Sequence, residues 1–350
     1  MRLARKLLYN ADTLKTELLH TRVCDLRVRL RGSRLGRCID RVLDEVRAFG
    51  ISLEPFFYLS DAFGCVQGTA NIGLGFWDAD PLLRDIRKDR TGDLRDEVDI
   101  VLLLKHEVGH AFCYAHKLYQ LPEFRRAFGI RGNFFASYPD DGAYRFDRWS
   151  VDHVNPVGDH YAQKHPDDDF AETFAVFLDR KAAWKERYRG RLGALRKIAL
   201  VGKLVRTYGG RPPATGAGSG AIDRPLDEMR LTVAQFFRVG RGRYLRNAQG
   251  FVDDELAGIF RSPRRLQKPT TSATTILARQ RKFVESSVRE RVRPKDPGVV
   301  ADVLDKIAAR LRVLGLVYLD EEHDRVLAEL HGLVLTKTWM FHRFGTFRDP

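Results

Sequence analysis

The spacing of hydrophobic positions in the first part of the chain alternates between helical and strand periods. Apolar residues recur every three or four positions at 35–49, which predicts an amphipathic helix. Two stretches at 53–59 and 68–77 predict strands, and the second is rich in glycine. A longer and more continuously apolar run then predicts a helix seated in a core at about 97–119.

Helical spacing dominates the rest of the chain. A short helix is expected after Pro122, and an irregular segment separates it from a helix that begins near Pro166. Apolar positions in that helix repeat at helical spacing: Phe170, Phe174, Phe177 and Leu178. After a stretch rich in glycine and proline at 209–222, further helices are predicted, most clearly at 299–314 and 324–336.

The predicted helix at 97–119 carries the motif His-Glu-x-x-His. Residues four apart lie on one face of a helix, so His106 and His110 can direct ring nitrogens at one Zn²⁺. Glu107 then lies beside the same site, where a carboxylate can act as a general base. A surface helix that carried this motif by chance would have charged residues at 101–104, where this chain has Val-Leu-Leu-Leu. The motif therefore predicts the zinc site of a metallopeptidase.

Two histidines supply half of a tetrahedral site, so a third protein ligand is expected, with water as the fourth. His116 has the spacing of the third histidine of metzincins, but Cys113 replaces the glycine that would turn the chain there. If the helix continues, His116 lies about 240° around the axis from His110, off the ligand face. Another alternative is a histidine of the segment before the second helix: His153, His160 or His165.

The acidic start of the helix at Pro166 offers the remaining candidates. Asp168 and Glu172 are four apart and share a face, so one can bind zinc while the other orients a ligand histidine. Asp167 is expected only to complement the helix dipole. Aspartate is shorter than glutamate by one methylene, which keeps Glu172 open as the alternative third ligand.

The same segment resembles a known pattern of zinc peptidases. From Tyr161 to Phe174 the sequence is similar to the glutamate-zincin helix of anthrax lethal factor-like peptidases. In that pattern a tyrosine precedes an acidic ligand by seven residues, as Tyr161 precedes Asp168. An Ala-Glu pair then follows the ligand after three and four residues, as Ala171 and Glu172 do here.

A closer resemblance, over about residues 23–205, is to a bacterial family of zinc-binding metallopeptidases. It is carried by the His106–His110 motif, by His165–Ala175, and by three further groups: Phe57-Tyr-Leu-Ser-Asp61, Trp184 and Arg196-Lys197. The resemblance is looser beyond this range, where 251–260 is also similar. The ligand position of this family is usually glutamate, whereas this chain has Asp168.

The motif and the resemblance together imply hydrolysis of peptide bonds. Glu107 would act as general base, Tyr161 would donate a hydrogen bond to the oxyanion, and Glu172 would support a ligand histidine. The Zn²⁺ would be held by three side chains: His106, His110 and Asp168. Two alternatives stay open. One is a zinc-dependent amidase or modified-peptide hydrolase, and the other is a non-catalytic protein with a structural zinc site and a basic helical interaction surface.

The expected fold is α+β, with a zincin-like catalytic domain followed by a mainly α-helical region. The expected divisions are 1–208 for the metallopeptidase domain, 209–222 for a linker or loop, and 223–350 for the basic helical region. The glycine-rich stretch 71–76 is open to two interpretations. It is either a strand edge that pairs with an extended substrate or a core strand whose glycines allow close packing.

Composition and hydropathy predict the cellular compartment of the protein. With 350 residues and 44% hydrophobic content it can bury a sizeable core. Charged and polar residues interrupt the first 19 positions, and no run approaches the roughly 18 apolar residues of a membrane span, so a cytoplasmic protein without membrane insertion is expected. The cysteines lack Cys-x-x-Cys spacing and are expected to be reduced thiols: Cys24, Cys38, Cys65 and Cys113.

The formal net charge of +14 is unevenly distributed. Residues 1–200 hold 33 basic and 29 acidic residues, whereas 201–350 hold 27 and 17. The basic segment 261–293 spreads its charge along predicted helices and shows no helix-turn-helix, zinc-finger or RNA-binding pattern. A peptide or protein substrate is therefore the expected partner, and nucleic acid is not. The sequence makes no prediction of the oligomeric state.

Overall fold

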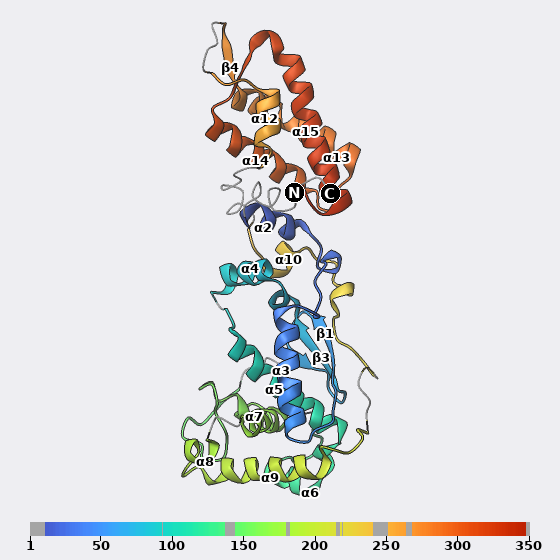
Figure 1. Cartoon of the computed structure of the whole chain (residues 1–350), viewed down its shortest axis with the longest axis vertical. Coiled ribbons are helices and arrows are strands. Elements are labelled where there is room, and N and C mark those ends of the chain that lie inside the picture. The colour runs from blue at the N-terminus through green and yellow to red at the C-terminus, as the bar shows by residue number, and fades with distance from the viewer. Residues whose placement is uncertain are drawn as a thin grey trace. The chain divides into compact units, whose positions relative to one another are not determined.

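The protein has a mixed α+β fold of two compact units, and the coordinates are a computed structural model (Figure 1). The structure describes residues 11–92, 94–136, 144–179, 183–214, 218, 220–240, 251–263 and 268–347. Unit 1 comprises Met1–Leu26, Asp85–Gly92 and Met229–Pro350, and unit 2 comprises Arg27–Arg84 and Asp93–Glu228.

This division differs from the expected one at both ends of unit 2. The chain up to Leu26 belongs with the C-terminal helices, where the Val23 and Cys24 N–H groups donate to the carbonyls of Leu231 and Met229, both at 2.9 Å. The described residues of the 209–222 stretch lie within unit 2 as a loop on its sheet. There the Asn71 side chain accepts from the Gly218 N–H at 2.9 Å and donates to the Ala221 carbonyl at 3.0 Å.

Unit 2 combines a small sheet with several helices. Its strands are β1 (Phe56–Ser60), β2 (Gly64–Cys65) and β3 (Asn71–Gly75). Its α-helices are α3 (Arg34–Ala48), α5 (Glu97–Ala115), α6 (Pro122–Ala127), α7 (Pro166–Leu178), α8 (Trp184–Arg187) and α9 (Leu192–Tyr208). The 3₁₀ turns are η1 (Val23–Asp25, in unit 1), η2 (Phe76–Ala79), η3 (Leu118–Gln120), η4 (Tyr161–Gln163) and η5 (Leu226–Glu228). Helix α4 (Pro81–Thr91) crosses the boundary between the units.

The sheet of unit 2 has the strand order β1-β3-β2, with β1 parallel and β2 antiparallel to β3. All five residues of β3 are buried, so this strand lies in the centre of the sheet and of the core. A Cβ at Gly73 would lie 2.9 Å from Ser60 Cβ and 3.2 Å from the Tyr58 hydroxyl, which explains the glycine. Of the two interpretations of 71–76, the structure therefore supports the core strand, and the short β2 lies at the edge.

The core of unit 2 is built on the apolar face of α3 and on α5. Ser33 caps α3, because its side chain accepts a hydrogen bond from the Gly36 N–H at 3.1 Å. The apolar positions of α3 then fall on one buried face: Leu35, Ile39, Val42 and Val46. Helix α5 is buried from Ile100 onward, apart from partly exposed leucines, and packs between α3 and α7. Figure 1 shows α3 beside the sheet and α9 along the end of the unit.

Unit 1 is mainly helical. Its α-helices besides the second part of α4 are α2 (Ala11–His20), α10 (Val233–Phe237), α12 (Asp253–Ile259), α13 (Ala273–Val292), α14 (Gly298–Leu314) and α15 (His323–Phe344). Strands β4 (Thr270–Ser272) and β5 (Val317–Leu319) pair antiparallel, and η6 (Asp320–Glu322) precedes α15. The two helices predicted most clearly, 299–314 and 324–336, are present as α14 and α15. In the described part of the chain no helix has the length and apolar character needed to cross a membrane.

Candidate metal centre

Helix α5 begins with a capping box and then enters the core. The Asp96 side chain accepts from the N–H groups of Val98 and Asp99, and the Asp99 carboxylate accepts from the Asp96 N–H. These caps satisfy backbone donors of the first turn, so the apolar part of the helix can be buried without unpaired groups there. His106, Glu107 and His110 lie in that buried part, with 5–6% of their surface exposed.

Helix α7 brings acidic residues into the same core. Pro166 occupies its first turn, and the His165 ring nitrogen Nδ1 accepts from the Asp167 N–H at 3.1 Å, which caps the helix. Phe170 and Phe174 are fully buried and fix the helix against its neighbours. Asp167 to Asp169 are all at most 3% exposed, which is rare for aspartate unless the charge is compensated.

Small residues let α5 and α7 approach closely. A Cβ added at Gly109 would lie 3.0 Å from Ala171 Cα and 3.2 Å from Phe174 Cβ. A larger side chain at Gly109 would therefore push the helices apart. Because aspartate is one methylene shorter than glutamate, this close approach explains how Asp168 can reach the two histidines of α5.

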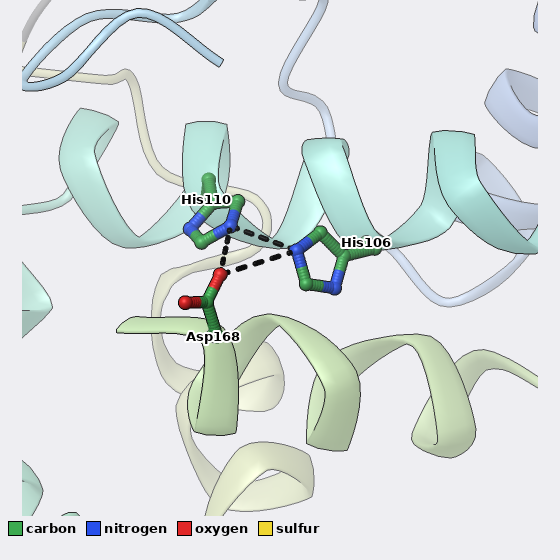
Figure 2. Close-up of side chains that lie close together, drawn as sticks. All are labelled: His106, His110 and Asp168. Atoms are coloured by element: carbon green, nitrogen blue, oxygen red, sulfur yellow. Dashed lines mark hydrogen bonds and ion pairs between the residues drawn. The ribbon is translucent and has the colours of Figure 1, made fainter. Parts of the chain in front are cut away.

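His106, His110 and Asp168 point toward one another from these two helices (Figure 2). The Nε2 atoms of the histidines are 2.9 Å apart, and Asp168 Oδ1 lies 3.7 Å from the first and 3.5 Å from the second. One ligand atom from each residue lies within 4.8 Å of the others. Three donor atoms of this kind are suited to surrounding a single small cation.

The opposite ring nitrogen of each histidine contacts a carboxylate. His106 Nδ1 lies 2.8 Å from Glu172 Oε1, and His110 Nδ1 lies 2.9 Å from Asp167 Oδ1. Tyr114 donates its hydroxyl to the other oxygen of Asp167. A carboxylate at Nδ1 favours a proton on that nitrogen, which leaves the Nε2 lone pair directed at the centre of the cluster.

The expectation that Asp167 serves only the helix dipole is wrong. Its side chain is fully buried and contacts His110, so it orients a candidate ligand in the same way as Glu172 orients His106. Spacing along α7 carried no signal for this contact, because Asp167 and Glu172 are five residues apart and do not share a helix face. The contact depends on where α7 crosses α5.

The side chains of the cluster fit a bound cation. Asp168 Oδ2 is buried without a hydrogen-bond partner among the described residues, and two imidazole nitrogens face each other at 2.9 Å. Burial by itself would lower the pKa of His106, yet the nearby carboxylate of Asp168 and the hydrogen bond with Glu172 raise it to about 9. The carboxylates thus favour a positive charge beside them, which a proton on the imidazole or a bound cation would each supply.

Glu107 lies at the sheet edge of the same site. Its Oε2 accepts a hydrogen bond from the Cys65 N–H of β2 at 2.8 Å, and its side chain is buried. The Val66 N–H donates to the Asn71 carbonyl at 2.8 Å, so the Cys65 N–H points away from β3 toward α5. The general-base candidate is thus held between its own helix and the backbone of an edge strand.

Tyr161 lies on the other side of His106. The ring centroids of the two residues are 5.7 Å apart, and Tyr161 begins the 3₁₀ turn η4 that leads into α7. Burial first, and then the carboxylates of Asp168 and Glu107, raise the pKa of Tyr161 above its ordinary value. The phenol therefore keeps its proton near neutral pH and can act as a hydrogen-bond donor.

Tyr144 is a neighbour of the site that sequence reasoning missed. Its ring packs against Tyr161 with centroids 6.0 Å apart, and its hydroxyl donates to the Asp159 carbonyl at 2.8 Å. It lies in the segment predicted to be irregular, where periodicity gives no indication of which side chains face inward.

None of the alternative histidines joins His106, His110 and Asp168 in the described cluster. His116 ends α5 and packs its ring against Phe112, with centroids 4.8 Å apart. The three others have different contacts: His153 with Ser150, His160 stacked on Phe146, and His165 as the cap of α7. Four cysteines also remain free thiols in the structure, and Cys113 is fully buried behind the motif.

No protein-family model matches this chain, and neither the curated proteins nor the solved structures gave a match. The resemblance to zinc-binding metallopeptidases therefore stays a prediction that rests on the residues of the two motifs.

Proposed function

We propose that the protein is a zinc-dependent metallopeptidase and that unit 2 is a zincin-like catalytic domain. The observation that carries the proposal is the buried cluster of His106, His110 and Asp168, with Glu107 adjacent on the same helix. A surface or purely structural helix gains nothing from burying a carboxylate between two histidines, because such charges are costly to desolvate. A metal ion offsets that cost.

Zinc suits this donor set better than the common alternatives. Two imidazole nitrogens and one carboxylate are a usual set for zinc, whereas magnesium and calcium prefer oxygen donors alone. Among the described histidines, cysteines and carboxylates, only three residues join the cluster. Three protein ligands leave one coordination position open, which is typical of catalytic sites, whereas structural sites are closed by four.

When bound, zinc supplies Lewis-acid chemistry that polarises a carbonyl and makes a water acidic near neutral pH. Glu107 would accept the proton of the attacking water and later deliver it to the leaving nitrogen. Tyr161 would donate a hydrogen bond to the oxygen that becomes negative in the tetrahedral transition state. Glu172 and Asp167 would hold the imidazoles of His106 and His110 in the orientation that this chemistry needs.

The short edge strand favours a peptide as the substrate over other amides. β2 lies at the edge of the three-stranded sheet, and its Cys65 N–H points at Glu107. An extended peptide that ran along this edge would place its backbone beside the general base, although the Cys65 N–H already donates to Glu107. An amide without an extended backbone would gain no such contact, although the hydrolytic chemistry would be the same.

Metal analysis tests the site. One zinc per chain is expected in the wild type, and His106→Ala and His110→Ala should each lose it, because each removes one of three protein ligands. His116→Ala is the matched control on the same helix and should keep its zinc. Full zinc occupancy in either ligand variant would exclude the proposed site.

Cleavage of a peptide library, followed by mass spectrometry, tests the reaction. Glu107→Gln should keep zinc and lose cleavage by a factor of at least about 100, the usual scale for loss of a general base. Glu97→Gln lies in the exposed first turn of the same helix and serves as the control. Zinc without cleavage in the wild type, across the library, would favour a non-catalytic site or an amide substrate of another kind.

A further inference from the structure

Lys164 contacts Tyr161 at the end of the 3₁₀ turn η4. The Lys164 N–H donates to the Tyr161 carbonyl at 3.0 Å, which closes the turn. In a 3₁₀ turn the side chains at positions i and i+3 eclipse each other, so Lys164 is brought directly over Tyr161. Its Nζ lies 3.0 Å from the phenol oxygen and 4.8 Å from the ring centroid.

The hydrogen bond to the Tyr161 hydroxyl is the polar contact that the Lys164 ammonium makes. No described carboxylate lies within ion-pair distance of its Nζ, and both side chains are half-buried. A lysine that only solvated the surface would extend into water, where it loses no rotamer freedom. The Lys164 ammonium thus lies on the phenol oxygen of Tyr161, a polar contact that Lys185 over the apolar ring of Trp184 does not have.

The chemistry of the two groups fixes the direction of the hydrogen bonds. An ammonium has donors and no acceptor, so Lys164 donates and the Tyr161 oxygen accepts. The phenol has a single proton, which must then be donated to a group other than Lys164. The Tyr161 ring packs on His106, so the cluster of His106, His110 and Asp168 lies next to the phenol ring.

We propose that Lys164 is a positioning residue for Tyr161: its ammonium occupies an acceptor site of the phenol and directs the Tyr161 O–H toward the cluster of His106, His110 and Asp168, where the oxyanion of the reaction would form. This inference rests on the proposed function. A cation on the phenol oxygen also polarises the O–H bond, so the hydrogen bond that Tyr161 donates becomes stronger.

Binding of an oxyanion mimic tests this role without a known substrate. The full-length chain would be loaded with Co²⁺ in place of zinc, and acetohydroxamate would be titrated while the visible Co²⁺ absorption is followed. Lys164→Met and Tyr161→Phe should each weaken acetohydroxamate binding by about 10-fold, the scale of one charge-assisted hydrogen bond. In the double variant the lysine change should add less than about twofold, because Lys164 acts through the phenol.

Three controls separate positioning from structural support. Lys164→Arg keeps a cationic donor and should retain acetohydroxamate affinity within about threefold. Lys185→Met removes another lysine that lies over an aromatic ring, that of Trp184, and should have no effect. Co²⁺ content and the spectrum without acetohydroxamate should stay as in the wild type for every variant, and Lys164→Gln replaces Lys164→Met if that protein misfolds.

The outcomes distinguish this inference from the proposed function. Equal losses from Lys164→Met in the wild-type chain and in the Tyr161→Phe variant would overturn the inference, since Lys164 would then act independently of the phenol. Normal Co²⁺ uptake with unchanged acetohydroxamate affinity in Lys164→Met would overturn it as well and leave the metal site intact. A wild-type chain that takes up no Co²⁺ would overturn the proposed function, and the role of Lys164 with it.

Discussion

Asp167 and His110 are in direct contact, with Oδ1 of the carboxylate 2.9 Å from Nδ1 of the imidazole. The next residue, Asp168, lies 3.5 Å from the opposite ring nitrogen of the same histidine. Two adjacent aspartates of one helix therefore serve two different atoms of one imidazole. Asp167 orients the ring, and Asp168 belongs to the cluster with His106 and His110.

Asp167→Asn should weaken zinc binding by about 10–100-fold without abolishing it, the range found for residues that orient a ligand histidine. An amide can still contact His110 Nδ1 but no longer offers a negative charge to its N–H. Competition with a chelator of known affinity would measure the change. Asp44→Asn, on the exposed part of α3, should leave the affinity unchanged. An unaltered affinity in Asp167→Asn would show that the contact does not support the metal.

The third ligand is decided by comparing Asp168→Asn with Glu172→Gln. Asp168→Asn should lose most zinc, because it removes the charged donor of the cluster. Glu172→Gln should keep most zinc and lose activity by about 10–100-fold, because His106 is then less well oriented. Zinc content and peptide cleavage would be measured on both. Zinc lost from Glu172→Gln and retained in Asp168→Asn would assign the ligand to Glu172.

Gly109→Ala should weaken zinc binding by at least about 10-fold, because the added Cβ would meet the backbone of Ala171 at 3.0 Å and move α7 with Asp168. Unfolding free energy should change little, since alanine gains up to about 1 kcal/mol of helix propensity against this crowding. Gly332→Ala in α15 meets no atom within 4 Å and should only stabilise. Unchanged zinc affinity in Gly109→Ala would mean that α7 does not need this close approach.

The stability of unit 1 should fall with rising pH because of His20. Its Nδ1 and Nε2 lie 2.5 Å from carboxylate oxygens of Asp296 and Asp302. Burial would lower the pKa of His20, but these two partners raise it above 6.5. The folded state thus holds a proton that the unfolded state releases, so the stabilisation is complete below 6.5 and declines from there to the raised pKa.

Amide hydrogen exchange of α14 at about pH 6 and about pH 7, corrected for the intrinsic rate, would measure this decline. It should be at most about 1.4 kcal/mol per pH unit and should shrink in His20→Gln. The comparison stops at about pH 7 because burial lowers the pKa of nearby Lys306 to about 8, so this lysine begins to lose its proton above pH 7. His323→Gln, at an exposed histidine, should keep the decline. The same decline in His20→Gln would assign it to another group.

Local sequence patterns predicted several of the elements and the first half of the site. Helical spacing predicted α3, α5, α14 and α15 because a helix buries one face, and that requirement is visible in the order of apolar residues. The pairing of His106 with His110, and of Asp168 with Glu172, follows from the four-residue repeat of a helix. These relationships lie within single elements, so no knowledge of packing is needed.

Relationships between elements were decided only by the tertiary structure. The contact of Asp167 with His110, the hydrogen bond of Glu107 to β2 and the close approach at Gly109 all depend on where α5 meets its neighbours. Val23 and Cys24 belong to unit 1 because they form hydrogen bonds with residues more than 200 positions later in the sequence. Periodicity reports which face of an element is buried, but many packings bury the same face, and side-chain shape chooses among them.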